Sequence, residues 1–365
     1  MNAVFDHAGR ISAARALLAD HDLDVLLLSG GPDLPYLMGY EAMPLERLTM
    51  AVIPRDGAAT LFVPELEAPR VEVVPELFEL RPWTETEDPV VLVADRCRAA
   101  RRVAVTDQTW AVFLLGLQRE LPGVEFVSAR PLSRALRVRK DPAEVELLRR
   151  AAHAADRVVT RLEATRFSGR SEHELSDVVA RMTLDQGSDV ATFRIVASGP
   201  NAASPHHEPG PRVIGEGDAV VVDFGGKVGG YCSDTTRTFH VGAPPVEFVE
   251  AYETVRRAQE AGVAAVAPGV AAQDVDAAAR GVIADAGYAD RFIHRLGHGI
   301  GLDVHEDPYL VDGNPEPLEP GMTFSIEPGV YLPGRFGIRI EDIVVCTATG
   351  VDSLNQSHHD LRIVE

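Results

Sequence analysis

The chain has 365 residues, of which 45% are hydrophobic, and this is enough for two domains that each bury a core. Its net charge of −20 argues against nucleic acid and anionic membranes as partners, because both attract basic surfaces. The three cysteines have no CxxC spacing, and no apolar run reaches the length of a membrane span. We therefore expect a cytoplasmic protein that depends on neither a disulfide scaffold nor a cysteine zinc site.

The first 130 residues predict an α/β domain. Apolar side chains recur at helical spacing over residues 11–19, and a short apolar run follows before the turn residues 29–32. The predicted strands cover residues 25–28, 49–53, 59–63, 103–105 and 124–127, and residues 81–89 are expected to form a polar loop. No pattern of His, Asp and Glu here suggests chemistry, so we interpret this region as architecture, substrate rim or subunit contact.

A second domain is expected to begin near residue 133, which divides the chain into residues 1–132 and 133–365. The boundary carries a basic patch, interpreted as a solvated linker face rather than an anion site: Arg134, Arg137, Arg139 and Lys140. Asp141-Pro142 predicts the start of a long helix, and the capping pattern at Ser171 predicts another over residues 171–186. A strand over residues 192–197, the loop SGPNAASPHHEPG and two alanine-rich helices, 246–267 and 271–286, are also predicted.

The stretch DFGGKVGGYCSD, residues 223–234, predicts a hairpin that brings two carboxylates together. A valine-rich strand is expected to end at Asp223, two Gly-Gly pairs supply the turn, and the returning strand covers residues 231–241. Asp234 then comes back beside Asp223, and the two repel unless one is protonated or a cation lies between them. Ordinary turn chemistry remains an alternative for these residues taken alone.

Three later places offer groups that could hold a metal ion. His298 lies in the glycine-rich segment GHGIG, Glu327 follows a short apolar strand, and Glu341 shares one face of another predicted strand with Arg339. A phosphate cradle at GHGIG is a weak interpretation, because neither a preceding strand nor a following Lys-Ser/Thr supports it. The negative charge of the four carboxylates equals the positive charge of two divalent cations. A shell of four carboxylates and one imidazole is mostly oxygen, which suits Mn²⁺, Mg²⁺, Co²⁺ or Zn²⁺.

The blocks DFGGKVGGYCSDTTRTF, GHGIGLDVHEDP, SIEPGVY and GIRIED resemble the successive signatures of one metallopeptidase family. This family contains Xaa-Pro dipeptidase (prolidase) and Xaa-Pro aminopeptidase, and the resemblance covers about residues 135 to 360. It implies an α+β architecture, with a pita-bread (creatinase/aminopeptidase-like) catalytic domain and a smaller creatinase-like α/β N-terminal domain. It also implies a dinuclear metal centre and a homodimer.

The resemblance implies a role for each matching residue. Asp223 would bind one metal, His298 and Glu327 would bind the other, and Asp234 and Glu341 would bridge them. Two histidines, His206 and His305, would contact the substrate carbonyl or the developing oxyanion, and Arg339 would orient the ligands. His294 would line the substrate pocket. His207, His358 and His359 are interpreted as surface or packed side chains.

The function implied is metal-assisted hydrolysis of the bond before proline in a dipeptide or short peptide, with Glu327 passing a proton to the prolyl nitrogen. Two divalent ions per subunit are expected, Mn²⁺ first, with Co²⁺ or Zn²⁺ as alternatives. The sequence VHEDP favours a dipeptidase. Tyr309, however, takes the place of an arginine that archaeal prolidases use to grip a dipeptide carboxylate, which leaves an Xaa-Pro aminopeptidase open. A non-peptide hydrolase or a non-enzymatic binding protein of the same fold is the remote alternative.

Overall fold

The computed structural model describes residues 5–365, which form two compact units. The first ends at Arg137 and the second spans Val138–Glu365. The domain limits expected from the sequence, 1–132 and 133–365, stay a prediction. In the part of the chain that is described, no helix is both long enough and apolar enough to cross a bilayer.

The first unit is built on a six-stranded mixed sheet in the order β4-β3-β2-β1-β5-β6. Its strands are β1 Val25–Leu28, β2 Met50–Pro54, β3 Ala59–Pro64, β4 Phe78–Trp83, β5 Arg102–Val105 and β6 Glu125–Ser128. The helices are α1 His7–Asp20, α2 Asp33–Met38, α3 Pro89–Cys97, α4 Ala111–Glu120 and α5 Arg130–Arg137, with the 3₁₀ turn η1 Glu65–Arg70. Strand β1 is buried along its whole length, as expected for a central strand covered on both faces.

Two sequence-based expectations fail near this unit. The polar loop expected from residue 81 begins too early, because β4 pairs with β3 as far as Trp83. Its Pro82 is tolerated since β4 lies at the edge of the sheet that the described residues form. The basic patch is a solvated face only in part. The Arg139 side chain is 60% exposed, but that of Arg137 is only 11% exposed beside Asp33 and that of Lys140 only 2% exposed beside Glu306.

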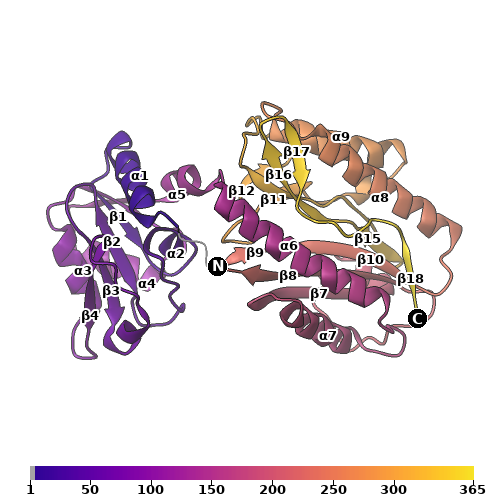
Figure 1. The fold of residues 1–365 in the computed structure, drawn as a ribbon, viewed down its shortest axis with the longest axis horizontal. Helices are drawn as coiled ribbons and strands as arrows, with labels where there is room; N and C mark the ends of the chain where they lie inside the picture. Colours follow the sequence, from indigo (N-terminus) through magenta and orange to yellow (C-terminus); the bar gives the residue numbers. More distant parts are fainter. Residues whose placement is uncertain (1–4) are drawn as a thin grey trace. The chain divides into compact units, whose positions relative to one another are not determined.

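The second unit holds two five-stranded sheets, each covered by a pair of helices (Figure 1). The first sheet has the order β18-β10-β8-β7, with β9 beside β8, and comprises β7 Val190–Ser198, β8 Ala219–Val228, β9 Tyr231–Cys232, β10 Thr235–Val241 and β18 Arg362–Val364. The second has the order β12-β11-β13-β16-β17 and comprises β11 Gly297–Gly299, β12 Glu306–Leu310, β13 Thr323–Ile326, β16 Asp342–Thr347 and β17 Gly350–Ser353. A separate hairpin pairs β14 Gly329–Leu332 with β15 Phe336–Arg339.

Helices α6 Pro142–Glu163 and α7 Glu172–Asp185 pack on the first sheet, and α8 Val246–Ala265 and α9 Ala272–Asp285 pack on the second. Two 3₁₀ turns, η2 Gly199–Ala203 and η3 Ala289–Arg291, complete the unit. Both predicted N-terminal caps are present, because Asp141 and Ser171 each form a full capping box with the glutamate three residues later. This arrangement of helices and sheets is the α+β fold that the sequence predicts.

The hairpin at residues 223–234 differs from the expectation in its details. Strand β8 does not end at Asp223 but continues to Val228, so Asp223 lies in the middle of the strand. The turn is made by Gly229 and Gly230 alone, which have φ of 57° and 86°. The returning strand is broken at Asp234, between β9 and β10. The first Gly-Gly pair, Gly225-Gly226, therefore lies within strand β8 and takes no part in the turn.

Candidate metal centre

Two carboxylates come from the first sheet. Asp223 on β8 lies opposite Thr236 on β10, and Asp234 occupies the break just before β10. Gly225 allows this break to lie against β8, because a Cβ atom there would stand 2.3 Å from the Ser233 carbonyl oxygen. The glycine is required for close approach of two backbone segments, and the approach carries Asp234 toward Asp223.

Three further groups come from the second sheet. His298 lies on β11, Glu327 directly follows β13, and Glu341 directly precedes β16. The glycines on either side of His298 permit the same kind of contact, since a Cβ at residue 297 would lie 1.9 Å from the Ser325 carbonyl oxygen. The two sheets are joined at this point, because the Glu341 backbone N–H donates to the Thr236 carbonyl at 3.1 Å.

The structure brings all five of these residues together. Ligand atoms of Asp223, Asp234 and Glu341 lie within 4.8 Å of one another, and the same holds for His298, Glu327 and Glu341. Glu341 belongs to both groups, so the two groups adjoin. A third such group contains Asp234 and His298 together with His305, which the sequence resemblance assigned to the substrate.

The orientation of His298 suits a cation. Its Nδ1–H donates to the Gly299 carbonyl at 3.1 Å, which leaves the Nε2 lone pair facing carboxylates. This Nε2 lies 3.3 Å from Glu327 Oε1 and 3.6 Å from Asp234 Oδ2. A lone pair and two carboxylate oxygens at these distances repel one another unless a proton or a cation lies between them.

The electrostatics of the carboxylates point the same way. Burial, followed by the charges of neighbouring carboxylates, raises the pKa of Asp234 and of Glu341 well above their usual values. Burial also raises the pKa of Asp223, whose Oδ1 is buried and has no hydrogen-bond partner among residues 5–365. Burial opposes ionisation of Glu327 too, but its contact with His298 outweighs burial and lowers its pKa to about 2. An unpaired acceptor among crowded, mostly oxygen donors fits divalent cations.

Arg339 holds the ligands in place. Its Nη2 donates to Asp223 Oδ2 at 2.6 Å, and its Nε donates to Thr236 Oγ1 at 3.1 Å. The Thr236 hydroxyl in turn donates to Glu341 Oε2 at 2.6 Å. One guanidinium therefore fixes one oxygen of Asp223 directly and one of Glu341 through the threonine.

The same guanidinium reaches the predicted substrate pocket. Arg339 Nη1 donates to the Tyr331 hydroxyl at 2.9 Å, so this hydroxyl can give its own proton to His294 Nε2, 2.8 Å away. The other nitrogen of His294 lies 2.8 Å from the Arg295 carbonyl and must donate to it. Burial lowers the pKa of His294, which agrees with the neutral ring that these two contacts require.

The sequence resemblance assigned catalytic roles to His206 and His305 but not to His207. His305 is solvent-exposed on one side, yet its burial on the other and the adjacent His298 ring lower its pKa to about 4, so it is neutral near pH 7. His206 makes a further, smaller contribution to the lowering of the His305 pKa. His207 is instead bonded to the buried Glu172 at 3.0 Å, and the structure thus separates the paired histidines.

The remaining sequence-based assignments can also be placed. Tyr309 lies opposite His298 across strands β11 and β12, and the Arg295 guanidinium covers its ring at 4.3 Å. His358 pairs with Glu163 and His359 with Asp342, so neither is among the clustered ligand groups. Sequence reasoning assigned no role to Tyr331, although it ends the SIEPGVY block, or to Arg295, which lies outside the quoted blocks. Thr236 could have been found, because it shares the face of Asp234 in the alternating strand.

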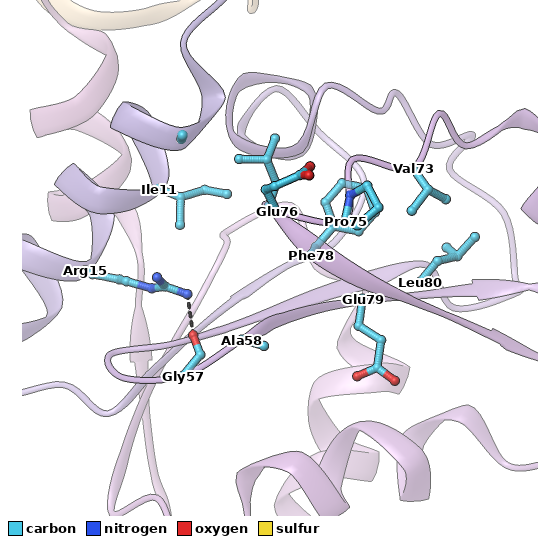
Figure 2. Close-up of a pocket in the computed structure, with 12 residues that line it drawn as sticks. Ile11, Arg15, Gly57, Ala58, Val73, Pro75, Glu76, Phe78, Glu79 and Leu80 are labelled. Carbon is cyan, nitrogen blue, oxygen red and sulfur yellow. Dashed lines mark hydrogen bonds between the residues drawn. The ribbon is translucent and has the colours of Figure 1, made fainter.

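A cavity of ≈ 530 Å³ lies wholly within the first unit and is distinct from these residues (Figure 2). It is lined by α1 and by the edge strand β4, and Arg15 donates from its side chain to the Gly57 carbonyl at 2.5 Å. None of the residues predicted to bind metal or substrate lines it. It gives no sign of hydrolytic chemistry.

Comparison with known proteins adds independent findings. Residues 146–348 match the metallopeptidase family M24, and residues 10–139 match the creatinase/prolidase N-terminal domain. The chain is 44% identical over 363 residues to a probable dipeptidase PepE of Mycobacterium tuberculosis, covering 98% of this chain and 96% of that protein.

Solved structures agree with the sequence matches. The dipeptidase PepE from Mycobacterium ulcerans superposes with a TM-score of 0.92 at 45% identity, covering 99% of this chain and 100% of that one. A recombinant prolidase from Thermococcus sibiricus superposes with a TM-score of 0.95 at 36% identity, covering 98% and 99% of the two chains.

Proposed function

This chain belongs to metallopeptidase family M24, and on that premise we propose that it hydrolyses the bond between any residue and a following proline, preferentially in dipeptides. One observation carries the proposal. Five side chains from two sheets place their ligand atoms in two adjoining groups that share Glu341. The names of the relatives, dipeptidase and prolidase, support the choice of substrate.

We propose that two divalent cations bind here, one held by Asp223 and the other by His298 and Glu327, with Asp234 and Glu341 between them. When bound, such ions activate a water molecule and polarise the substrate carbonyl. The oxygen-rich donor set favours Mn²⁺, with Co²⁺ and Zn²⁺ as alternatives. A homodimer in the cytoplasm also remains a proposal, and the three free cysteines are compatible with a reducing compartment.

The residues around the ligands can carry out the proton and charge transfers. As water adds to the carbonyl carbon, the carbonyl oxygen gains negative charge, which neutral His305 and nearby His206 can stabilise by donating hydrogen bonds. Glu327 is ionised, so it can accept the proton of the attacking water and deliver it to the prolyl nitrogen as the C–N bond breaks. His294 lines the pocket as a neutral ring, oriented by Tyr331.

Arg295 supports the preference for dipeptides. Arg295 lies three residues before His298 in the sequence. Its guanidinium is exposed and covers the ring of Tyr309. It makes no ion pair with any carboxylate in residues 5–365. An unpaired arginine beside the ligands is suited to bind the free carboxylate of a dipeptide, in place of the arginine that Tyr309 replaces.

The test compares Ala-Pro with Ala-Pro-Ala, with and without a chelator, for the wild type and for Arg295→Ala. We expect the wild type to cleave Ala-Pro and to lose this activity when the chelator is added. We expect Arg295→Ala to raise KM for Ala-Pro at least about 10-fold, since a charge-assisted contact is lost. Arg291→Ala is the matched control, because Arg291 is exposed nearby and makes no side-chain contact. Cleavage of the tripeptide alone would assign an Xaa-Pro aminopeptidase instead.

A further inference from the structure

A single buried carboxylate lies behind the loop that carries His206. This carboxylate, Glu172, is the first residue of α7 and is 0% exposed. Each of its hydrogen bonds comes from the segment of residues 198–210. The donors are Ser198 N at 2.8 Å, Ser198 Oγ at 2.7 Å, Asn201 Nδ2 at 3.0 Å, His207 Nε2 at 3.0 Å and Gly210 N at 3.1 Å. Glu172 thus fastens both ends of this loop and its middle.

Glu172 is ionised in this position. Burial alone would raise the pKa of its carboxyl, but the hydrogen bonds from Ser198, Asn201 and His207 outweigh burial and lower it. Neither lysine nor arginine is among the groups that donate to it in the described chain. Its charge is stabilised by loop donors and by the N-terminus of α7, so an alternative loop conformation would leave a buried charge uncompensated.

The opposite side of the loop rests on the metal-ligand scaffold. The Pro205 carbonyl accepts a hydrogen bond from Arg339 Nη1 at 3.3 Å. Gly337 lies so close to the loop that a Cβ there would stand 1.8 Å from the Ala202 carbonyl oxygen. The loop is therefore held between α7 on one side and β15 on the other.

His206 itself depends on this support. Its side chain is exposed and makes no hydrogen bond with any of residues 5–365, whereas the next residue, His207, is bonded to Glu172. The position of the His206 ring is consequently set by the backbone on either side of it. A shift of that backbone would move the ring relative to His305 and to the substrate carbonyl.

We propose that Glu172 is a positioning residue for the hydrolytic reaction, holding loop 199–210 in the conformation that presents His206 to the substrate. The inference rests on the proposed function only for the role of His206. His207 serves as one of the anchors in this arrangement, and His206 is the working group.

The principal variant is Glu172→Gln. Glutamine keeps the shape but turns one acceptor oxygen into a donor amide, which then faces N–H or O–H groups of the loop. We expect kcat to fall on the order of 10 to 100-fold, the cost of misplacing a catalytic group by about 1 Å, with KM and metal content unchanged. Glu208→Gln is the matched control, because Glu208 lies in the same loop, is exposed and makes no side-chain contact, and it should leave kcat unchanged.

A double-mutant cycle separates positioning from general stabilisation. If Glu172 acts through His206, Glu172→Gln should cost nothing further in the His206→Ala background. An equal loss of kcat in both backgrounds would overturn the proposal. Should Glu172→Gln fail to fold, Asn201→Ala removes one loop donor and leaves the carboxylate in place, and the same cycle with His206→Ala applies.

A measurement without substrate distinguishes failure of this inference from failure of the proposed function. Amide hydrogen exchange over residues 199–210 should be faster in metal-loaded Glu172→Gln than in the wild type or in Glu208→Gln. Unchanged exchange together with wild-type kcat would overturn the role of Glu172. Faster exchange in a protein that cleaves no Xaa-Pro bond would support the anchor and refute the proposed substrate.

Discussion

Replacing Asp234 by asparagine should make the metal-free protein more stable while abolishing its response to metal. Asp234 is 4% exposed, and its ligand atom lies within 4.8 Å of those of Asp223 and Glu341. Asparagine has nearly the same shape but carries no charge, so it relieves repulsion without opening a cavity. The variant would contradict the usual rule that a buried substitution destabilises, because here the native carboxylate is stabilising only when cations are bound.

The size of the effect follows from the crowding. Two unit charges 4.8 Å apart repel by about 3.5 kcal/mol at an effective dielectric constant of 20. Burial, then the neighbouring carboxylates, raises the pKa of Asp234 above its unfolded value, so the folded metal-free state retains a proton that the unfolded state releases. The free energy of unfolding of the metal-free protein therefore falls as pH rises through the pKa that Asp234 has in the folded state. We expect Asp234→Asn to gain about 1 to 3 kcal/mol in mildly alkaline buffer and less in acid.

Thermal unfolding of chelated protein, with and without added Mn²⁺, measures both halves of this prediction. A gain of 1 kcal/mol corresponds to roughly 2 to 4 °C for a unit of this size. Mn²⁺ at about 100 times its dissociation constant should stabilise the wild type by about 2.7 kcal/mol per site and the variant by much less. Asp312→Asn, an exposed change without side-chain contacts, is the control. A metal-free variant that melts below the wild type in alkaline buffer would refute the reasoning.

Three further substitutions test the supports around the centre. Arg339→Lys keeps the charge but loses the planar fork, and should lower metal affinity or kcat about 10 to 100-fold in a metal titration; wild-type affinity and rate would count against this role. Tyr331→Phe leaves the His294 ring without its hydrogen-bond donor and should lower the free energy of unfolding in urea by about 1 to 3 kcal/mol. An unchanged urea midpoint would contradict this prediction. Gly337→Ala places a Cβ 1.8 Å from the Ala202 carbonyl oxygen and should lower kcat by moving the loop, whereas Gly281→Ala, in open space on a helix, should stabilise by up to about 1 kcal/mol.

Local patterns predicted much of the fold. The capping boxes at Asp141 and Ser171 could be found because each is complete within four residues. Buried strands such as β1 were found since short apolar runs flanked by turn residues have few alternatives. The edge strand β4 was missed because its partly exposed pattern, interrupted by Pro82, looks like a loop until its pairing with β3 is known.

The candidate site was predicted less evenly. Carboxylates and a histidine in glycine-rich segments stand out in a sequence, and their ligand atoms do converge. Gly225 was assigned to a turn, because the sequence could not reveal that the Ser233 carbonyl approaches its Cα from another segment. Glu172 looked like an ordinary residue in the first turn of a helix, and its five donors come from residues 26 or more positions away. Such contacts depend on how two elements pack, which local sequence does not encode.

Arg339 explains how the loop and the metal ligands become one unit. Its rigid guanidinium contacts Pro205 in the loop and Asp223 at the centre at the same time. Glu172 fixes the loop from the other side, so the support of His206 continues through a chain of hydrogen bonds to Asp223, a proposed metal ligand. Because a planar fork cannot follow two partners that move independently, displacement of the loop must strain the Asp223 contact or break the contact with Pro205. The anchor beneath the loop and the carboxylates of the centre are therefore parts of a single network, although they lie on opposite sides of loop 199–210.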